Sequence, residues 1–132
     1  MTSGVIESFA GKETFVRVDV AQAEGLMVVR PAGARLDLQA AGPFRLTLLR
    51  LIRDGHRRLV VDLADVEFID SAGLGALISV LKTLKKSVGE GEIHLANVQP
   101  GVADLLEILR LDRVLPSFPS VAQAVHSFAE PR

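Results

Sequence analysis

The stretch that most constrains the fold is residues 60–77, which read VVDLADVEFIDSAGLGAL. An apolar, partly β-branched run over residues 59–63 is typical of a strand buried in the middle of a sheet. After an acidic turn the chain returns to apolar residues, and residues 70–73 open a long helix. Ser71 is therefore expected at the N-terminus of a helix, where backbone N–H groups lack intrahelical partners and the helix dipole is positive.

The composition is that of one globular domain. With 132 residues, 48% of them hydrophobic, the chain can bury a core unaided, and the absence of cysteine excludes disulfides and thiolate chemistry. Fifteen basic and 16 acidic residues nearly cancel, which predicts no direct binding of nucleic acid. No apolar run approaches about 18 residues and the N-terminus lacks a signal-peptide pattern, so we expect a cytoplasmic protein without membrane insertion.

Strand and helix patterns alternate along the chain. Strands are predicted over residues 14–20, 26–30, 58–63, 92–96 and 114–115, and helices over residues 38–54, 72–88, 100–110 and 121–128. The short link between the first two strands makes them antiparallel, whereas the later strand–helix–strand alternation predicts parallel pairs with right-handed crossovers. The fold class is therefore α/β, with a small mixed, mostly parallel sheet of four or five strands flanked by four helices.

Two segments fit this pattern less well. Residues 1–13 are small, polar and weakly patterned, so we expect a flexible N-terminal arm there and the domain itself over residues 14–130. Pro43 falls inside the predicted helix of residues 38–54. Because proline is tolerated only in the first turn, the regular helix is expected to begin near Ala41.

The residues alone leave two interpretations of the serine open. Serine and aspartate are common N-caps, so Asp70 or Ser71 could serve only to bond the first N–H groups, and Gly73 only to allow close packing. In the second interpretation, Ser71 is a phosphorylation switch on a docking surface. Phosphate adds about −1.5 to −2 charges, which a helix N-terminus tolerates but an acidic partner site does not.

The run FIDSAGLG at residues 68–75, preceded by VVDL, resembles the signature of STAS domains, the bacterial anti-sigma factor antagonists. The resemblance covers residues 15–128 and includes RLD at residues 35–37 and LDRVLP at residues 111–116. It implies a protein that, when unphosphorylated, binds an anti-sigma factor with serine kinase activity and thereby frees a sigma factor. The kinase then phosphorylates Ser71 to end the binding, and a serine phosphatase restores the serine.

The resemblance also implies which residues surround the phosphoacceptor. Asp37, Asp70 and Gly73 are expected to shape the partner-binding surface around Ser71. Asp37 matches an acidic position near the family's switch serine, and a role as a helix cap explains it equally well. Leu74, expected to be exposed near the helix start, would supply apolar contact to the partner kinase. The alternative is a place in the core, because Leu74 also begins the apolar stripe of the helix.

Two positions depart from the family pattern. Ala72 stands where many members have a second serine, which leaves Ser71 as the acceptor of the motif. Ala34 stands where a glycine is frequent, and Gly33 comes one residue early, so the placement of Asp37 follows less directly from the resemblance. The domain is expected to be a monomer or a weak dimer.

Other kinds of chemistry have weaker support in the sequence. Ser71 does not lie in the Gly-x-Ser-x-Gly elbow of hydrolases and the three histidines are scattered, so we expect no enzyme and no catalytic residues. The acidic residues before the helix lack calcium-loop spacing, and Gly73-x-Gly75 lacks the rest of a phosphate-binding loop. We therefore expect neither a metal nor a cofactor.

The alternative function is a STAS docking subunit in a stress-signalling scaffold or a lipid-transport complex. Binding in such an assembly would not depend on the state of Ser71. An anti-sigma factor antagonist should instead lose its partner on Ser71→Asp and keep it on Ser71→Ala.

Overall fold

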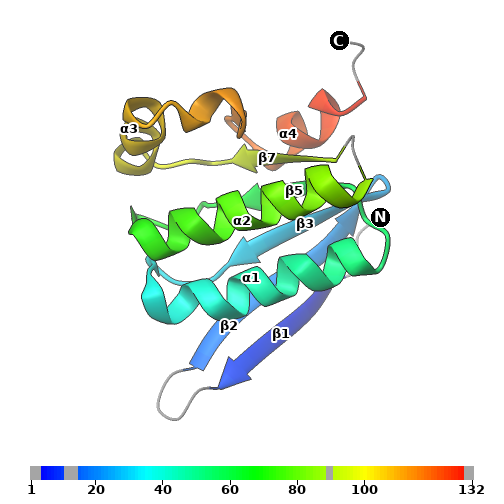
Figure 1. The fold of residues 1–132 in the computed structure, drawn as a ribbon, viewed down its shortest axis with the longest axis horizontal. Helices are drawn as coiled ribbons and strands as arrows, with labels where there is room; N and C mark the ends of the chain where they lie inside the picture. Colours follow the sequence, from blue (N-terminus) through cyan, green and yellow to red (C-terminus); the bar gives the residue numbers. More distant parts are fainter. Residues whose placement is uncertain (1–3, 11–14, 89–90, 130–132) are drawn as a thin grey trace.

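Strands and helices alternate along most of the chain, and the structure places the helices against a central sheet (Figure 1). The computed structural model describes residues 4–10, 15–88 and 91–129. The strands are β1 (Gly4–Ala10), β2 (Phe15–Ala23), β3 (Leu26–Pro31), β4 (Arg35–Leu36), β5 (Arg58–Asp62), β6 (Phe68–Ile69), β7 (Glu92–Ala96) and β8 (Ser117–Phe118). The helices are α1 (Leu38–Arg53), α2 (Ser71–Val88), α3 (Pro100–Ile108), the 3-10 turn η1 (Leu111–Arg113) and α4 (Val121–Ser127).

The main sheet has the strand order β1-β2-β3-β5-β7-β8. The pairs β1–β2 and β2–β3 are antiparallel, and the three pairs that follow are parallel. This confirms the predicted α/β fold class, including the antiparallel start and the parallel crossovers that follow it. The strand count is higher than expected, because the sheet has six strands and β4 pairs with β6 separately.

The additional strand comes from the segment that the sequence pattern assigns to a flexible arm. Within residues 1–13, Gly4–Ala10 forms β1 and pairs with β2 from Gly4↔Ala21 to Ala10↔Phe15. The remaining residues of that predicted arm, 1–3 and 11–13, lie outside the described residues. An edge strand is held by backbone hydrogen bonds, so it needs no strong alternation of side chains, and periodicity alone misses it.

Helix α1 begins at Leu38, which corrects the expected start near Ala41. Asp37 caps the helix, and the N–H of Ala41 donates to the Asp37 carbonyl at 2.8 Å, so the first turn is fixed before Pro43 is reached. The N–H that proline lacks would have bonded the carbonyl of Gln39, an exposed residue where water can replace it.

Strand β5 is buried on both faces, as its apolar run predicts. Leu59 and Val61 belong to the main core, which α1 and α2 cover with residues such as Phe44 and Leu77. Val60 points to the other face and belongs to a second core beneath α4. Figure 1 shows α1 and α2 side by side in front of the sheet. The central strands are therefore sandwiched, as in other parallel α/β sheets.

His94 of β7 is buried between the sheet and α4, and its hydrogen bond to Ser127 connects β7 to α4. Its side chain is 1% exposed, with Nε2 2.8 Å from Glu92 Oε1 and Nδ1 2.6 Å from Ser127 Oγ. The Ser127 hydroxyl donates its only proton to the Ala124 carbonyl at 2.6 Å. The buried imidazole therefore has a hydrogen-bond partner at each of its two ring nitrogens. The imidazole also stacks on Phe128, with ring centroids 3.8 Å apart.

Removing the Ser127 hydroxyl should therefore destabilise the fold. Ser127→Ala leaves the buried Nδ1 of His94 without its hydrogen-bond partner, and we expect the free energy of unfolding to fall by about 1–3 kcal/mol. Urea denaturation followed by circular dichroism measures this loss. Ser117→Ala, at an exposed serine of β8, is the control and should stay within about 0.5 kcal/mol of the wild type. Equal stability of the two variants would show that the hydrogen bond between His94 and Ser127 does not stabilise the fold.

Candidate functional site

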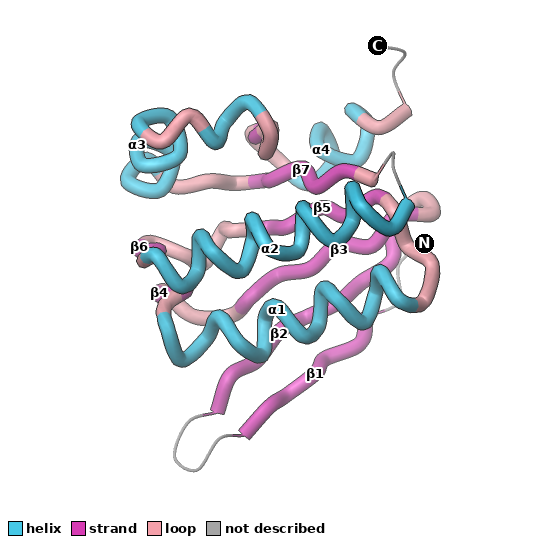
Figure 2. The backbone as a smooth tube through the Cα atoms, in the orientation of Figure 1, coloured by secondary structure: helices cyan, strands magenta, loops and turns pink. Residues whose placement is uncertain are grey.

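The two motif helices begin side by side. Strands β4 and β6 pair in parallel, with Leu36 opposite Ile69, and the next residues along each strand are Asp37 and Asp70. Figure 2 shows β4 and β6 together at the end of the molecule where α1 and α2 start. The pairing of two short strands thus brings two helix N-termini, and an aspartate at each, to one surface.

Asp70 is the residue that caps α2. Its Oδ1 accepts the N–H of Gly73 at 3.0 Å, and its carbonyl accepts the N–H of Leu74 at 3.0 Å. Ser71 is the first residue of the helix, is exposed, and forms no side-chain hydrogen bond with any other described residue. Of the two cap candidates, the structure selects Asp70, and the serine hydroxyl is not needed to start the helix.

Asp37 caps α1 in the same way. Its Oδ1 accepts the N–H groups of Gln39 at 3.2 Å and Ala40 at 3.3 Å, and Arg35 Nε donates to its Oδ2 at 3.4 Å. Partial removal of the carboxylate from water works to raise its pKa. The hydrogen bonds from Ala40, Arg35 and Gln39 outweigh that effect, and the pKa of Asp37 lies below its ordinary value. Asp37 is therefore ionised at neutral pH and adds negative charge to this surface.

Gly73 lets the first turn of α2 lie directly on β4. A Cβ at this buried position would overlap the carbonyl oxygen of Leu36 and lie 2.8 Å from Ile69 Cγ1. Only glycine allows such an approach of helix to strand backbone. Gly73 therefore fixes how closely the start of α2 packs on β4, and its own position is buried.

Leu74 does not lie on this surface, which corrects the expectation that it is exposed. It is 7% exposed and belongs to the main core, because position 74 starts the apolar stripe that continues through Leu77 and Leu81. The exposed apolar residues here are Phe68, 42% exposed, and Leu38, 77% exposed.

The two exposed apolar residues come from the two motif segments that pair through β4 and β6. Leu38 is the first residue of α1, the position that Ser71 holds in α2. Phe68 lies on the opposite face of β6 from the buried Ile69, and the guanidinium of Arg35 sits over its ring, 4.3 Å from the centroid. The alternation of side chains along a strand could have revealed Phe68, since Ile69 is the residue that points to the core.

The structure also contains a serine, a histidine and a carboxylate in one chain of contacts. In Ser127, His94 and Glu92, however, the imidazole is 1% exposed and stacks on the Phe128 ring, and the serine hydroxyl also donates to the Ala124 carbonyl. A nucleophilic serine needs an imidazole that is free to accept its proton next to a site that a substrate can enter, and this imidazole is buried beneath α4. No group of three or more metal-ligating side chains occurs among the described residues.

None of the helices in the described ranges is both long and apolar enough to span a membrane.

Comparison with known proteins identifies the family of the chain. The model of the STAS domain family matches residues 17–124 of the chain. The anti-sigma F factor antagonist of Paenibacillus polymyxa is 25% identical over 111 residues, which are 83% of this chain and 92% of that protein.

Solved structures share the fold at lower identity. An anti-sigma-factor antagonist (STAS) domain protein from Planctomyces limnophilus matches with a TM-score of 0.74 and 21% identity, covering 83% of this chain and 95% of that one. The Bacillus cell fate determinant SpoIIAA in its phosphorylated form matches with a TM-score of 0.64 and 16% identity, covering 94% and 99%. The family resemblance predicted from the motif is thereby confirmed.

Proposed function

Because this chain belongs to the STAS domain family, among the anti-sigma factor antagonists, we propose that phosphorylation of Ser71 switches its binding to an anti-sigma factor. The unphosphorylated protein binds an anti-sigma factor with serine kinase activity and so releases a sigma factor, which regulates transcription indirectly. The kinase then transfers the terminal phosphoryl group of ATP to the Ser71 oxygen, and the hydroxyl proton is lost. A serine phosphatase hydrolyses the ester and restores the hydroxyl.

The observation that carries this proposal is that the capping residue of α2 and the proposed phosphoacceptor are two different residues. Asp70 holds the first turn by accepting the Gly73 N–H, while the adjacent Ser71 is exposed and does not hold the turn. A kinase can reach such a hydroxyl, and esterifying it removes no hydrogen bond of the described fold. The modified domain should therefore stay folded and lose only its partner.

The charges near Ser71 support a loss of binding on phosphorylation. Asp37 and Asp70 are held by N–H groups of the two helices, and Glu67 is exposed one residue before β6. Arg35, the cation on β4, is already engaged by Asp37 and by the Phe68 ring. Phosphate would add about −1.5 to −2 charges to a surface that is already negative. A partner site that packs on the neutral hydroxyl without a cation of its own would then have to bury this charge unpaired.

The exposed apolar residues support docking of the unmodified surface. Phe68 and Leu38 are exposed on the segments that lead into α2 and α1, and large apolar side chains are typical of the central part of protein interfaces. The Arg35 guanidinium restrains the Phe68 ring before any partner arrives, which lowers the entropy lost on binding.

The proposal is tested by identifying the acceptor in the presence of the partner. The tagged protein captures its partner from a host lysate, ATP is added, and peptide mass spectrometry locates the phosphate. We expect one phosphate on Ser71, none on Ser71→Ala, and unchanged modification of the control Ser117→Ala, another exposed serine. Phosphate on Ser71→Ala at wild-type levels would contradict the proposal.

A further inference from the structure

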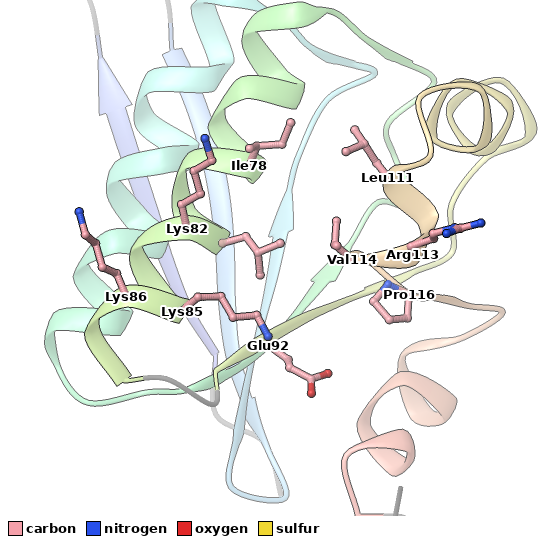
Figure 3. A pocket seen from close by; sticks show the side chains of 10 residues that line it. Ile78, Lys82, Lys85, Lys86, Glu92, Leu111, Arg113, Val114 and Pro116 are labelled. Carbon is pink, nitrogen blue, oxygen red and sulfur yellow. The ribbon is translucent and has the colours of Figure 1, made fainter.

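A groove lies between the C-terminal half of α2 and the segment from η1 to β8. Its volume is about 820 Å³, within the range of about 300–1,000 Å³ typical of small-molecule sites. Ile78 and Leu81 form one wall, and Leu111, Val114 and Pro116 face them across the groove (Figure 3). The surface around Ser71, Asp37 and Asp70, here called the switch surface, contributes no residue to the groove. Ile78, the groove residue of α2 nearest to Ser71 in sequence, lies about 10 Å from it along the helix axis.

The rim of the groove is positively charged. Lys82, Lys85 and Lys86 of α2 and Arg113 of η1 line it, and Glu92 is the one carboxylate among the lining residues. Figure 3 shows the Lys85 side chain extending toward Glu92 across the groove. Glu92 is engaged by the buried His94.

These four cations carry more positive charge than Glu92, the one carboxylate among the lining residues, can balance. None of them forms an ion pair or a side-chain hydrogen bond with another described residue, although arginines elsewhere, such as Arg17 and Arg30, do pair with aspartates. An apolar groove with unpaired cations on its rim matches a ligand that has an apolar body and an anionic end.

The side chains that line the groove further limit the chemical class of ligand that it can bind. The lining side chains that form the walls are aliphatic or proline, with no aromatic ring among them. Nucleobases are commonly held by stacking on aromatic rings and by polar groups at their edges, which these walls lack. An alkyl chain needs neither, because it is held by apolar burial alone.

From this combination we propose that the groove binds a fatty acid anion. Its chain lies between α2 and η1, against Leu81 and Val114, and its carboxylate lies at the cationic rim, where Lys85 is the principal contact. The inference does not depend on the switch at Ser71, and either can fail without the other.

Ligand titration tests the site in the full chain. Because the chain has no tryptophan and no tyrosine, amide NMR shifts and calorimetry are the suitable readouts. Decanoate, kept below its micelle concentration, should give saturable shifts confined to the residues lining the groove. Decanol should bind at least about tenfold more weakly, because it lacks the charge that the rim lysines contact. Acetate at the same concentration should cause no shift.

Matched variants distinguish the contribution of the rim charge to decanoate binding from that of the apolar wall. Lys85→Glu should weaken decanoate binding by about tenfold or more, whereas Arg53→Glu, the same charge change at an exposed residue that does not line the groove, should leave it unchanged. Val114→Gln alters an exposed wall residue, so the fold should persist while decanoate binding weakens by a similar factor.

Several results would overturn the proposal. These are the absence of saturable decanoate binding, equal affinity for decanol and decanoate, and equal effects of Lys85→Glu and Arg53→Glu. Binding of GTP without decanoate would assign the groove to a nucleotide, and binding to anionic vesicles without monomeric decanoate would assign it to a membrane surface. A dimer that Val114→Gln dissociates in sedimentation would assign it to a second copy.

Discussion

Ser71→Asp is expected to weaken binding of the anti-sigma factor by about a hundredfold, a loss of about 3 kcal/mol of binding free energy. The exposed hydroxyl is adjacent to Asp70, and Asp37 caps the neighbouring helix. A charge introduced there is stripped of water in the complex without gaining a counterion, and an unpaired buried charge is among the costliest changes at an interface. Calorimetric titration of the captured partner measures the loss.

The same substitution should leave the free protein intact. The new carboxylate stands in the first turn of α2, where the helix dipole favours negative charge, so the free energy of unfolding should be unchanged or slightly raised. Chemical denaturation checks this and separates lost binding from lost folding.

Two variants control the binding experiment. Ser71→Ala removes the hydroxyl without adding charge and should keep wild-type affinity, and Ser117→Asp places the same charge on β8 and should also bind normally. If Ser71→Asp and Ser71→Ala bind the partner equally, the switch is refuted. That result would favour the constitutive docking subunit.

The fold could be predicted wherever burial imposes a period on the sequence. The stripe through Leu77 and Leu81 located α2, and the unbroken apolar run of residues 59–63 located β5, because both elements face a core. Strand β1 is an edge strand that pairs through its backbone, so no such period marks it. Helix α1 starts three residues earlier than proline chemistry suggests, because the Asp37 cap fixes its first turn.

For the candidate site, the sequence predicted the position of Ser71 at a helix start, but it predicted the residues around Ser71 less well. Ser71 is exposed at a helix start, as the motif implies. Asp70 and Ser71 have equivalent capping chemistry, so only the Gly73 N–H contact identifies the cap. The location of Asp37 and Asp70 at neighbouring helix starts depends on the pairing of β4 with β6, which have two residues each and are too short for any periodic pattern.

Leu74 shows why a motif does not by itself identify contact residues. The family signature places it one turn from the serine, but the helix period turns its side chain into the core with Leu77. Phe68, three residues before Ser71 in the same motif, is the residue exposed beside it. Burial therefore has to be considered before any motif residue is assigned to an interface.

Gly73→Ala is the substitution expected to cost the most stability, lowering the free energy of unfolding by about 3 kcal/mol. Its methyl group would overlap the Leu36 carbonyl oxygen, which also accepts the Asp70 N–H at 3.4 Å. That oxygen belongs to the β4 backbone and cannot move without disturbing the pairing of β4 with β6. The helix must shift instead, which separates the two N-termini that form the switch surface.

Gly75→Ala is the matched control for this prediction, since it lies two residues further along α2 and an added Cβ meets no atom within 4 Å. Alanine is the better helix former, so this variant should gain about 0.5–1 kcal/mol of stability. Urea denaturation of both variants measures the contrast, which is opposite in sign for the same chemical change on one helix. If Gly73→Ala were as stable as Gly75→Ala, α2 would not rest on the backbone of β4, and the placement of Ser71 beside Asp37 would lose its structural basis.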